Sequence, residues 1–257
     1  MSNPFDLRGK VAIVTGCDTG LGRGMAFALA EAGCAISGVN VVAPTETAEY
    51  LKSGGHRFLD IRADLATIEP IPEIIQRTVT EYGRIDILVN NAGIIRRADA
   101  LEFTERDWDD VIAVNLKAVF FLSQAAARQF IRQQAPGETA RGRIISVASL
   151  LSFQGGIRVP SYTAAKSGVL GLTRLLANEW AKYGITVNAI APGYMETDNT
   201  APLRADAARS KEILARIPLG RWGLPSDLAG PVVFLASDAS AYVTGHALAV
   251  DGGWLAR

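Results

Sequence analysis

Cysteine is scarce in this 257-residue sequence, and its two cysteines form no recognisable pattern. Cys17 and Cys34 lack the spacing of metal ligands, and two thiols make a poor disulfide framework for a chain of this length. We therefore expect both to be reduced packing residues in a cytoplasmic protein, and we predict no metal site.

The sequence also lacks an excess of charge of either sign and any long apolar run. Its 26 basic residues balance its 26 acidic residues, so no basic field is available to hold a nucleic acid or an anionic membrane. No run approaches the roughly 18–20 apolar residues of a membrane span, and residues 1–6 do not resemble a signal peptide. We expect a soluble protein that binds neither nucleic acid nor a membrane.

Apolar residues are abundant, at 49% against 20% charged residues, which is enough for a substantial core. Short β-branched runs alternate with helix-length segments, a pattern typical of a doubly wound α/β fold with a parallel sheet, here a single domain over residues 1–257. The predicted strands span residues 11–15, 35–41, 57–63, 85–90, 143–148, 186–191 and 247–250. The predicted helices include residues 22–32, 71–82, 107–130, 161–183 and 225–235.

Two segments do not fit this alternation. Residues 134–142 contain Pro136 and two glycines, and we predict a loop there. Residues 193–217 follow a strand end and contain Pro202 and several charges. Because ligands of open α/β sheets bind outside the carboxyl ends of the strands, we predict that this segment is a mobile cover over a substrate site. A solvated pair of surface helices is the alternative.

A glycine-rich loop directly follows the first predicted strand. Its G-x-x-x-G-x-G spacing lets the backbone approach a pyrophosphate, whose charge then meets the free N–H groups of the next helix. A glycine-rich turn without a ligand is the alternative, but the position between first strand and first helix favours a phosphate site. The predicted contacts are Gly16, Asp18, Thr19, Gly20, Leu21 and Gly22.

Asn40 lies at the end of the second predicted strand, where folds of this kind bind the adenosine ribose. An acidic residue there favours NAD and a nearby arginine favours NADP, whereas Asn40 is neutral but able to bond a hydroxyl. No Lys or Arg lies between Arg23 and Lys52, so we predict NAD. Further cofactor contacts are predicted at the ends of the third and fourth strands: Asp64, Leu65, Asn91, Ala92 and Gly93. Ordinary turns at the strand ends are the alternative.

Tyr162 and Lys166 are four residues apart, on one face of a predicted helix. A neighbouring ammonium lowers the pKa of a phenol, which is about 10 in water, so we expect Tyr162 to transfer a proton near neutral pH. Ser149 follows the fifth predicted strand and is expected to polarise the substrate oxygen, while Asn115 is expected to anchor a water linked to Lys166. By itself, this spacing usually means a surface helix pair.

Taken together, these motifs resemble the short-chain dehydrogenase/reductase family over essentially the whole chain. The resemblance implies a Rossmann fold with a seven-stranded sheet, a nicotinamide cofactor whose ribose is bound by Lys166, and a homotetramer, or less often a dimer. Residues expected to flank the nicotinamide are Pro192, Gly193 and Thr197. The resemblance rests on the glycine loop and on residues 90–93, Asn115, Ser149, Tyr162, Lys166, Pro192 and Gly193.

Within that family, five stretches resemble the sugar-acid dehydrogenases. They are residues 16–22, 44–47, 95–97, 152–162 and 221–225. This resemblance implies an NAD-linked enzyme of bacterial pectin or uronate catabolism. One position departs from the pattern, because Asn40 stands where NAD enzymes usually have an acidic residue.

A sugar acid needs a cation for its carboxylate and polar groups for its hydroxyls. Arg97 follows the fourth predicted strand and Arg158 precedes Tyr162 by four residues, so both are expected on loops at the carboxyl edge of the sheet. Surface or interface ion pairs are the alternative for each arginine. The further predicted substrate contacts are Gln154, Tyr194, Asn199, Arg204 and Trp222.

The leading hypothesis is NAD-linked interconversion of a secondary alcohol and a ketone on a small-molecule deoxy sugar acid. Tyr162 exchanges the proton, while the cofactor carries the hydride. A general ketone or 3-oxoacyl reductase using NADPH is one alternative, disfavoured by the lack of basic residues around the phosphate loop. A non-catalytic nucleotide-binding sensor is the other, disfavoured because Tyr162 and Lys166 are both present.

Overall fold

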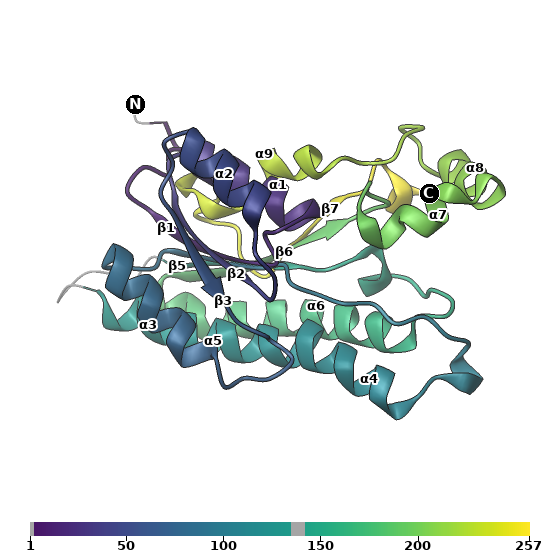
Figure 1. The fold of residues 1–257 in the computed structure, drawn as a ribbon, viewed down its shortest axis with the longest axis horizontal. Coiled ribbons are helices and arrows are strands. Elements are labelled where there is room, and N and C mark those ends of the chain that lie inside the picture. Colours follow the sequence, from purple (N-terminus) through teal and green to yellow (C-terminus); the bar gives the residue numbers. More distant parts are fainter. Residues whose placement is uncertain (1–2, 135–141) are drawn as a thin grey trace.

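Parallel strands form the central sheet of the computed structural model, which describes residues 3–134 and 142–257 (Figure 1). Seven strands lie in the order β3-β2-β1-β4-β5-β6-β7, each parallel to its neighbours. The predicted doubly wound α/β fold is thereby confirmed. The strands are β1 (Val11–Thr15), β2 (Ala35–Asn40), β3 (Phe58–Arg62), β4 (Ile87–Asn90), β5 (Gly142–Val147), β6 (Ile185–Pro192) and β7 (Ala247–Val250).

The burial of the strands explains their sequence pattern. Every residue of the five inner strands is buried, and the two edge strands β3 and β7 are only partly buried. Because helices cover both faces, the inner strands are apolar nearly throughout instead of alternating between apolar and polar residues.

Helices form a layer on each face of the sheet (Figure 1). The layer drawn above the sheet contains α1 (Gly20–Glu31), α2 (Thr45–Ser53) and α9 (Ala229–Ala236). The layer below contains α3 (Ile71–Tyr82), α4 (Glu105–Ile112), α5 (Ala118–Arg132) and α6 (Pro160–Trp180). Each layer has its own buried cluster against the sheet, so the core is divided in two by the strands.

The strand order reverses between β1 and β4, which are neighbours although two strands separate them along the chain. In open α/β sheets the ligand crevice lies at such a reversal, outside the carboxyl ends of the strands. Two short helices, α7 (Ala201–Ala205) and α8 (Ala207–Arg216), stand apart from both layers at the right-hand end of the molecule in Figure 1. The segment predicted to cover the site is therefore helical.

Three parts of the helical prediction differ from the structure. α2 is not among the predicted helices, because only Thr47 and Leu51 of its residues are buried and its apolar periodicity is weak. The helix predicted over residues 107–130 is interrupted by a π-helical turn, Ala113–Lys117. The loop predicted over residues 134–142 lies mostly outside the described residues, and Gly142 is the first residue of β5.

The helical run Glu105–Arg132 is long and apolar enough to cross a membrane by length and composition alone. In the fold it belongs to the core, because Leu122 and Phe130 are almost completely buried in the cluster beneath the sheet. Val119 is also buried, and α5 packs against α3 and α6. The apolar face of this run is therefore covered by the protein itself.

Gly22 lies where the loop after β1 closely approaches the end of β4. An added Cβ would collide with the carbonyl group of Gly16 and the side-chain amide of Asn91. We therefore expect Gly22→Ala to lower the free energy of unfolding by about 1–3 kcal/mol, measured by urea denaturation.

The matched control for this loop is Gly171→Ala on α6. Nothing lies within 4 Å of an added Cβ at that position, and alanine is the better helix former by about 1 kcal/mol. The control is expected to be as stable as the wild type or more stable. Equal stability of the two variants would contradict the close approach.

Candidate active site

The loop between β1 and α1 is shaped to approach an anion. Gly16 and Gly20 adopt φ values of 63° and 53°, which glycine tolerates at little cost. α1 begins at Gly20 with Thr19 as its N-cap residue, and no side chain caps the first turn. The N–H groups of that turn are therefore available to a negatively charged group.

Asn91 ties this loop to the end of β4. Its Nδ2 atom donates to the carbonyl oxygens of Thr15 at 2.9 Å and Gly16 at 2.8 Å. The backbone N–H groups of Asn91 and Ala92 both donate to Thr15 Oγ1. Candidate cofactor contacts that are distant in the sequence are thus brought to one place.

Asn40 supports the loop from the end of β2. Its Oδ1 atom accepts a hydrogen bond from the Cys17 backbone N–H at 2.8 Å, and the residue is only 3% exposed. Asn40 thus supports the phosphate loop, and its expected contact with a ribose hydroxyl stays a prediction. Beyond β2, the apolar side chains of Val41 and Val42 are exposed.

Two arginines that are distant in the sequence lie near the end of β2, so the expectation of little local basic charge is wrong. Arg62 donates to the Val41 carbonyl oxygen at 3.4 Å and pairs with Asp60 at 2.9 Å. Arg23 pairs with Glu46 at 2.6 Å. Each guanidinium is therefore already matched by a carboxylate.

Ser149, Tyr162 and Lys166 meet at the carboxyl end of β5. Ser149 is the N-cap of a short 3-10 turn, and Ser152 in that turn donates to the backbone carbonyl of Lys166 at 2.7 Å. This bond fixes the turn against α6. Lys166 Nζ lies 5.6 Å from the centre of the Tyr162 ring, one helical turn away. The predicted grouping of these three side chains is present in the fold.

Burial dominates the acid–base properties of this group. It raises the pKa of the Tyr162 phenol, while a hydrogen bond with Ser149 and the positive charge of Arg97 act to lower it. Burial also lowers the pKa of Lys166 to about 8, although its Nζ atom donates to the Val147 carbonyl at 2.6 Å. The phenol pKa is raised and not lowered as expected, because desolvation outweighs the Ser149 hydrogen bond and the Arg97 charge.

These two shifts define the protonation state of the site at neutral pH. A phenol with a raised pKa keeps its proton, so Tyr162 presents an O–H donor. A donor in this state suits protonation of a carbonyl oxygen, whereas proton removal from an alcohol needs the phenolate. Tyr162 is therefore a proton donor at neutral pH in the protein without cofactor, and its phenolate fraction grows as the pH rises.

Asn115 fixes the loop that follows β4. The side chain is completely buried, its Oδ1 accepts from the Ile94 backbone N–H at 2.8 Å, and its Nδ2 donates to the Ile94 carbonyl at 2.9 Å. Asn115 lies in the π-helical turn between α4 and α5, a local irregularity that is frequent at functional sites. Its side-chain amide therefore positions the loop, and the expected anchoring of a water linked to Lys166 stays a prediction.

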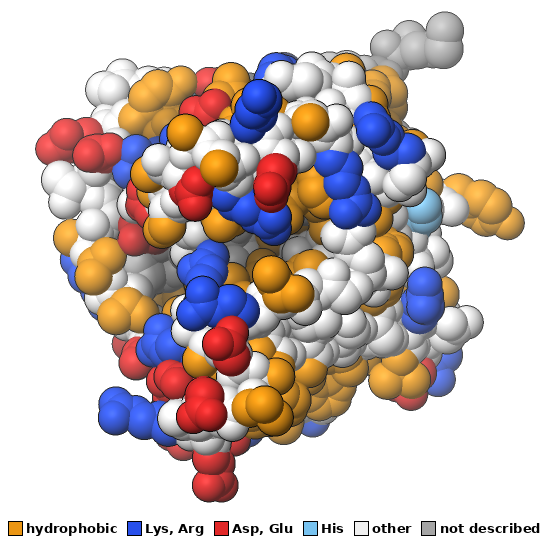
Figure 2. Space-filling view, turned by 90° about the vertical axis from the view of Figure 1, so that its right-hand side faces the viewer, with side chains coloured by type: hydrophobic (Ala, Val, Ile, Leu, Met, Phe, Trp, Pro, Cys, Tyr) orange, Lys and Arg blue, Asp and Glu red, His pale blue; other side chains and the backbone are white. Residues whose placement is uncertain are grey.

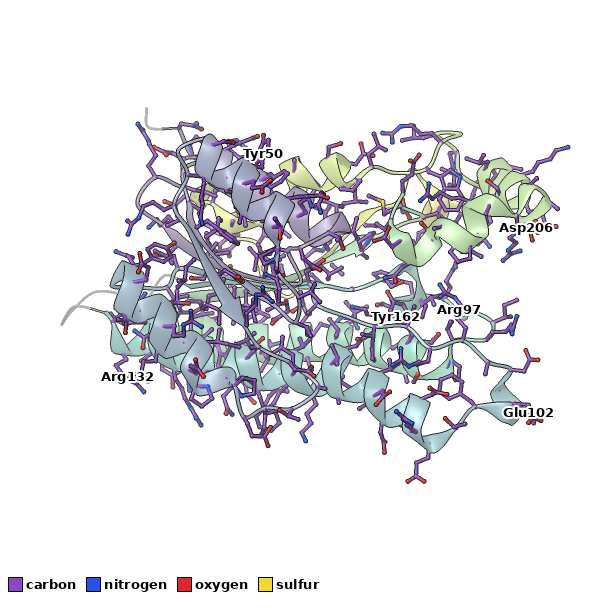
Figure 3. The ribbon with its side chains drawn as sticks, in the orientation of Figure 1. Tyr50, Arg97, Glu102, Arg132, Tyr162 and Asp206 are labelled. Carbon is purple, nitrogen blue, oxygen red and sulfur yellow. The ribbon has the colours of Figure 1, made fainter. Side chains whose placement is uncertain are left out.

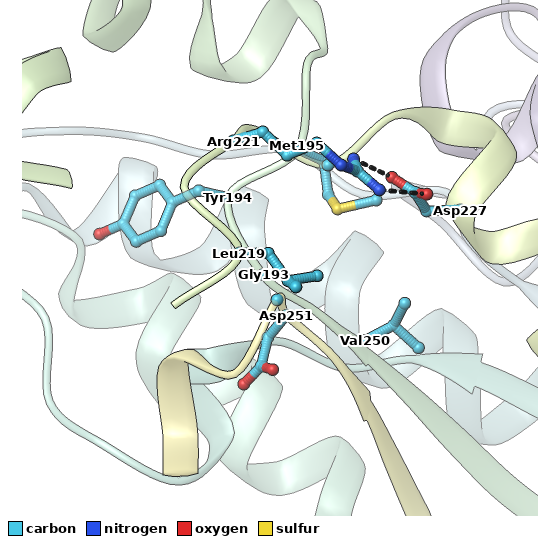
Figure 4. A pocket seen from close by; sticks show the side chains of 10 residues that line it. Gly193, Tyr194, Met195, Leu219, Arg221, Asp227, Val250 and Asp251 are labelled. Atoms are coloured by element: carbon cyan, nitrogen blue, oxygen red, sulfur yellow. Dashed lines mark hydrogen bonds and ion pairs between the residues drawn. The ribbon is translucent and has the colours of Figure 1, made fainter. Parts of the chain in front are cut away.

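The backbone after β6 is held firmly where the nicotinamide is predicted to lie. Gly193 donates to the Val250 carbonyl at 2.9 Å, and it packs so closely on Asp251 that no Cβ would fit. Arg221 and Asp227 form a bidentate ion pair beside this segment (Figure 4). The start of the covering segment thus has a defined position relative to the sheet.

A cavity of about 620 Å³ is lined by Ser149, Tyr162 and the covering segment. Figure 3 places Tyr162 and Arg97 next to each other below α7. Figure 2 views this end of the molecule, with Lys and Arg side chains around a central hollow. The predicted substrate residues that line the cavity are Arg97, Gln154, Arg158, Tyr194 and Asn199.

Two predicted substrate residues lie elsewhere. Trp222 is buried in an apolar cluster, where its ring meets the Tyr194 ring edge-on. Arg204 faces a separate groove that is lined by Thr19 and by Thr197, the predicted nicotinamide neighbour. Both positions are therefore removed from the cavity that contains Tyr162, and a role for them in contacting substrate has no geometric support.

The cavity residues that sequence reasoning missed include Arg209, Arg216 and Trp254. The arginines lie on α8, within residues 193–217, where a pair of surface helices was only the alternative prediction. Apolar residues three to four positions apart, such as Ile213 and Ile217, mark the inner face of that helix and were the available signal. Trp254 reaches the cavity only because β7 returns the chain to the carboxyl edge of the sheet.

The residues present fit a nicotinamide dinucleotide. The uncapped first turn of α1 suits its pyrophosphate, and Asp64 and Leu65 follow β3 where the adenine is predicted. Gly93 lies against Asn115 and leaves a small-residue surface on the way to Tyr162. Within residues 3–134 and 142–257, no group of three His, Cys, Asp or Glu side chains is arranged to hold a metal ion.

Comparison with known proteins agrees with this geometry. The family model described as enoyl-(acyl carrier protein) reductase matches residues 16–255. The chain belongs to the short-chain dehydrogenase/reductase family, and it is an oxidoreductase that acts on a secondary alcohol with a nicotinamide cofactor.

Several similar proteins act on sugar acids. The chain is 67% identical to 2-dehydro-3-deoxy-D-gluconate 5-dehydrogenase of Escherichia coli, over 98% of each chain. A solved structure from Agrobacterium tumefaciens, assigned as a 2-deoxy-D-gluconate 3-dehydrogenase with bound NADP, is 56% identical with a TM-score of 0.91 and full coverage of both chains. A gluconate 5-dehydrogenase from Burkholderia cenocepacia, in complex with NADP and tartrate, is 38% identical with a TM-score of 0.91, covering 99% of this chain and 98% of that one.

The protonation state of Tyr162 predicts opposite pH dependences for the two reaction directions. Between pH 7 and 9, we expect alcohol oxidation to accelerate because the phenolate fraction grows, and ketone reduction not to accelerate. Tyr162→Phe removes the exchangeable proton and is expected to lower kcat by at least about 100-fold in both directions.

Steady-state rates at saturating cofactor measure both effects. Thr163→Val on the same turn of α6 is the control, because Thr163 Oγ1 donates only to the Val159 carbonyl. Oxidation that slows from pH 7 to 9, or full activity in Tyr162→Phe, is incompatible with this chemistry.

Proposed function

We propose that this protein is an NAD-dependent 2-dehydro-3-deoxy-D-gluconate 5-dehydrogenase, which interconverts a secondary alcohol and a ketone at carbon 5 of a deoxy sugar acid. The observation that supports it most is that one cavity contains both the proton-transfer group and several cations. Ser149 and Tyr162 line it together with Arg97, Arg158, Arg209 and Arg216. A carboxylate with several hydroxyls matches that lining.

The chain's own residues supply proton transfer and orientation. In reduction, Tyr162 donates its phenolic proton to the carbonyl oxygen, while Ser149 bonds the same oxygen. In oxidation, the phenolate accepts the hydroxyl proton. The buried Lys166 ammonium keeps positive charge on the inner side of the phenol, and Arg97 does so within the cavity. The nicotinamide cofactor, when bound, supplies or accepts the hydride.

The surroundings of β2 favour NAD over NADP. The first exposed side chains past the strand are those of Val41 and Val42, which offer a 2′-phosphate no hydrogen bond. The two arginines near this strand end are already paired, Arg62 with Asp60 and Arg23 with Glu46. A phosphate at this place would therefore compete with a carboxylate for either arginine.

The cavity also separates this proposal from a general NADPH-dependent ketone or 3-oxoacyl reductase. An apolar acyl chain gains nothing from four arginines, and desolvating their charges would cost free energy. A non-catalytic nucleotide sensor would need neither the Ser149 bond to Tyr162 nor a buried Lys166.

We further propose a cytoplasmic homotetramer that serves pectin or uronate catabolism. Cys17 and Cys34 are both buried free thiols whose pKa values burial raises, as suits a reducing compartment. Light scattering of the purified protein tests the assembly, and growth of a deletion strain on galacturonate tests the pathway. A monomer, or unimpaired growth, counts against the corresponding proposal.

A substrate panel tests the proposed activity. We expect 2-dehydro-3-deoxy-D-gluconate to exceed simple secondary alcohols and 3-oxoacyl thioesters by at least about 100-fold in kcat/KM, because only the sugar acid uses the cationic lining. The assay follows reduced cofactor by absorbance. Preference for the acyl thioester would favour the reductase alternative, and binding of cofactor without turnover of any compound would favour the sensor.

Cofactor preference has a separate structural test. We expect a higher kcat/KM with NAD than with NADP in the wild type. Asp60→Asn releases Arg62 from its ion pair and is expected to raise kcat/KM for NADP about 5- to 10-fold, with little effect on NAD.

The double variant Asp60→Asn/Arg62→Gln is the control for released charge, and it is expected to return to the wild-type ratio. A wild type that prefers NADP, or a gain in Asp60→Asn that survives removal of Arg62, rules out this explanation of the preference.

A further inference from the structure

The arginines that line the cavity are of two kinds. Arg158 pairs with Asp99 at 3.2 Å, and Arg209 pairs with Glu212 at 2.9 Å. In the part of the chain that the structure describes, Arg97 and Arg216 have no carboxylate partner. Two cations in the cavity are therefore not neutralised by the protein itself.

The two unpaired arginines lie against different parts of the cavity. Arg97 donates to the Asn199 carbonyl at 3.0 Å and is close enough to Tyr162 for its charge to lower the phenol pKa. Arg216 is the last residue of α8, and its contacts are with Trp254 and Gln154. Arg97 thus lies at the end of the cavity next to Tyr162, whereas Arg216 lies at the end formed by α8 and the C-terminal segment.

Arg216 is held in a defined orientation. Its guanidinium lies over the Trp254 ring, 4.0 Å from the centroid, and donates to Gln154 Oε1 at 3.4 Å. Trp254 Nε1 donates to the same oxygen at 3.2 Å. A guanidinium has five N–H donors, so the stacked group keeps several for a ligand while its plane is fixed by the indole.

The support beneath Arg216 connects it to the chemistry. Trp254 is only 4% exposed and packs in one apolar cluster with Ile213 and Ile217, on either side of Arg216, and with Leu150. Leu150 directly follows Ser149. The position of the guanidinium relative to the catalytic hydroxyls is therefore set by a buried core and not by a surface loop.

We propose that Arg216 binds the substrate carboxylate and that Trp254 and Gln154 are positioning residues for it. This inference rests on the proposed sugar-acid function and assigns its specificity to one side chain. An unpaired, stacked guanidinium forms a bidentate pair with a carboxylate without first breaking an ion pair. Arg158, in contrast, would have to leave its ion pair with Asp99.

The assignment of Arg216 to the carboxylate is tested by measuring kcat/KM of Arg216→Gln on two compounds that differ only in the carboxylate. The pair is 2-dehydro-3-deoxy-D-gluconate and its analogue with a hydroxymethyl group in place of the carboxylate. The variant is expected to lose about 10- to 100-fold in kcat/KM for the acid, mainly through KM, and less than about threefold for the analogue. Arg216→Lys keeps the charge without the bidentate fork and is expected to lie between.

Lys211→Gln is the matched control, because Lys211 is an exposed cation on the same helix and does not line the cavity. In this variant, the ratio of kcat/KM for the acid to kcat/KM for the analogue is expected to match that of the wild type. An unchanged ratio in Arg216→Gln overturns the proposal, and so does an equal loss on both compounds, which would show a purely structural role.

Binding of D-gluconate, measured by calorimetry with cofactor present, distinguishes a failure of the proposed function from a failure of the Arg216 assignment. If the wild type turns over no deoxy sugar acid, the proposed function fails. If wild type and Arg216→Gln bind gluconate equally well, the carboxylate assignment fails whatever the turnover. Weaker binding in Arg216→Gln, but not in Lys211→Gln, supports it.

Discussion

A protonated, partly buried phenol beside a buried ammonium group, at the carboxyl end of β5, is the interaction on which the rest of the site depends. Burial acts on the two groups in opposite directions, raising the pKa of Tyr162 and lowering that of Lys166 to about 8. The pair is one helical turn apart, so neither can move away from the other without disturbing α6. The remaining polar contacts of the site keep this pair next to the sheet edge, where a dinucleotide can reach it.

Those contacts share one design, in which a side-chain amide or hydroxyl bonds the backbone of a neighbouring loop. Asn91 bonds the glycine loop, Asn115 bonds the loop after β4, and Ser152 bonds α6 at the carbonyl of Lys166. Each such bond satisfies a backbone group that would otherwise be buried without a partner. The loops at the carboxyl ends of the strands are thereby fixed by side chains from other segments of the chain. These bonds help to maintain the cavity next to Tyr162.

The sequence alone was sufficient for the features that are periodic or local. The strand over residues 11–15 and the helix over residues 71–82 have the predicted bounds, because buried strands and amphipathic helices leave regular apolar patterns. The Tyr162–Lys166 pair was predictable for the same reason, since helical spacing places i and i+4 on one face. Features that depend on neighbours in space were not predictable: Asn40 bonds Cys17, Arg62 approaches Val41 from another strand, and Trp254 supports Arg216. The direction of the Tyr162 pKa shift belongs to this second group, because desolvation is a property of the folded environment.

The titration of the Tyr162 phenol is the most direct test of this chemistry. Tyrosine labelled with ¹³C at the ring carbon that bears oxygen reports ionisation by NMR, and the Tyr162 signal is identified by its loss in Tyr162→Phe. For the protein without cofactor, the account predicts a phenol that is protonated at pH 7 and titrates above about 10, the value of a free tyrosine. A Tyr162 signal that titrates near neutral pH would show that Lys166 and Arg97 outweigh burial, and would contradict it.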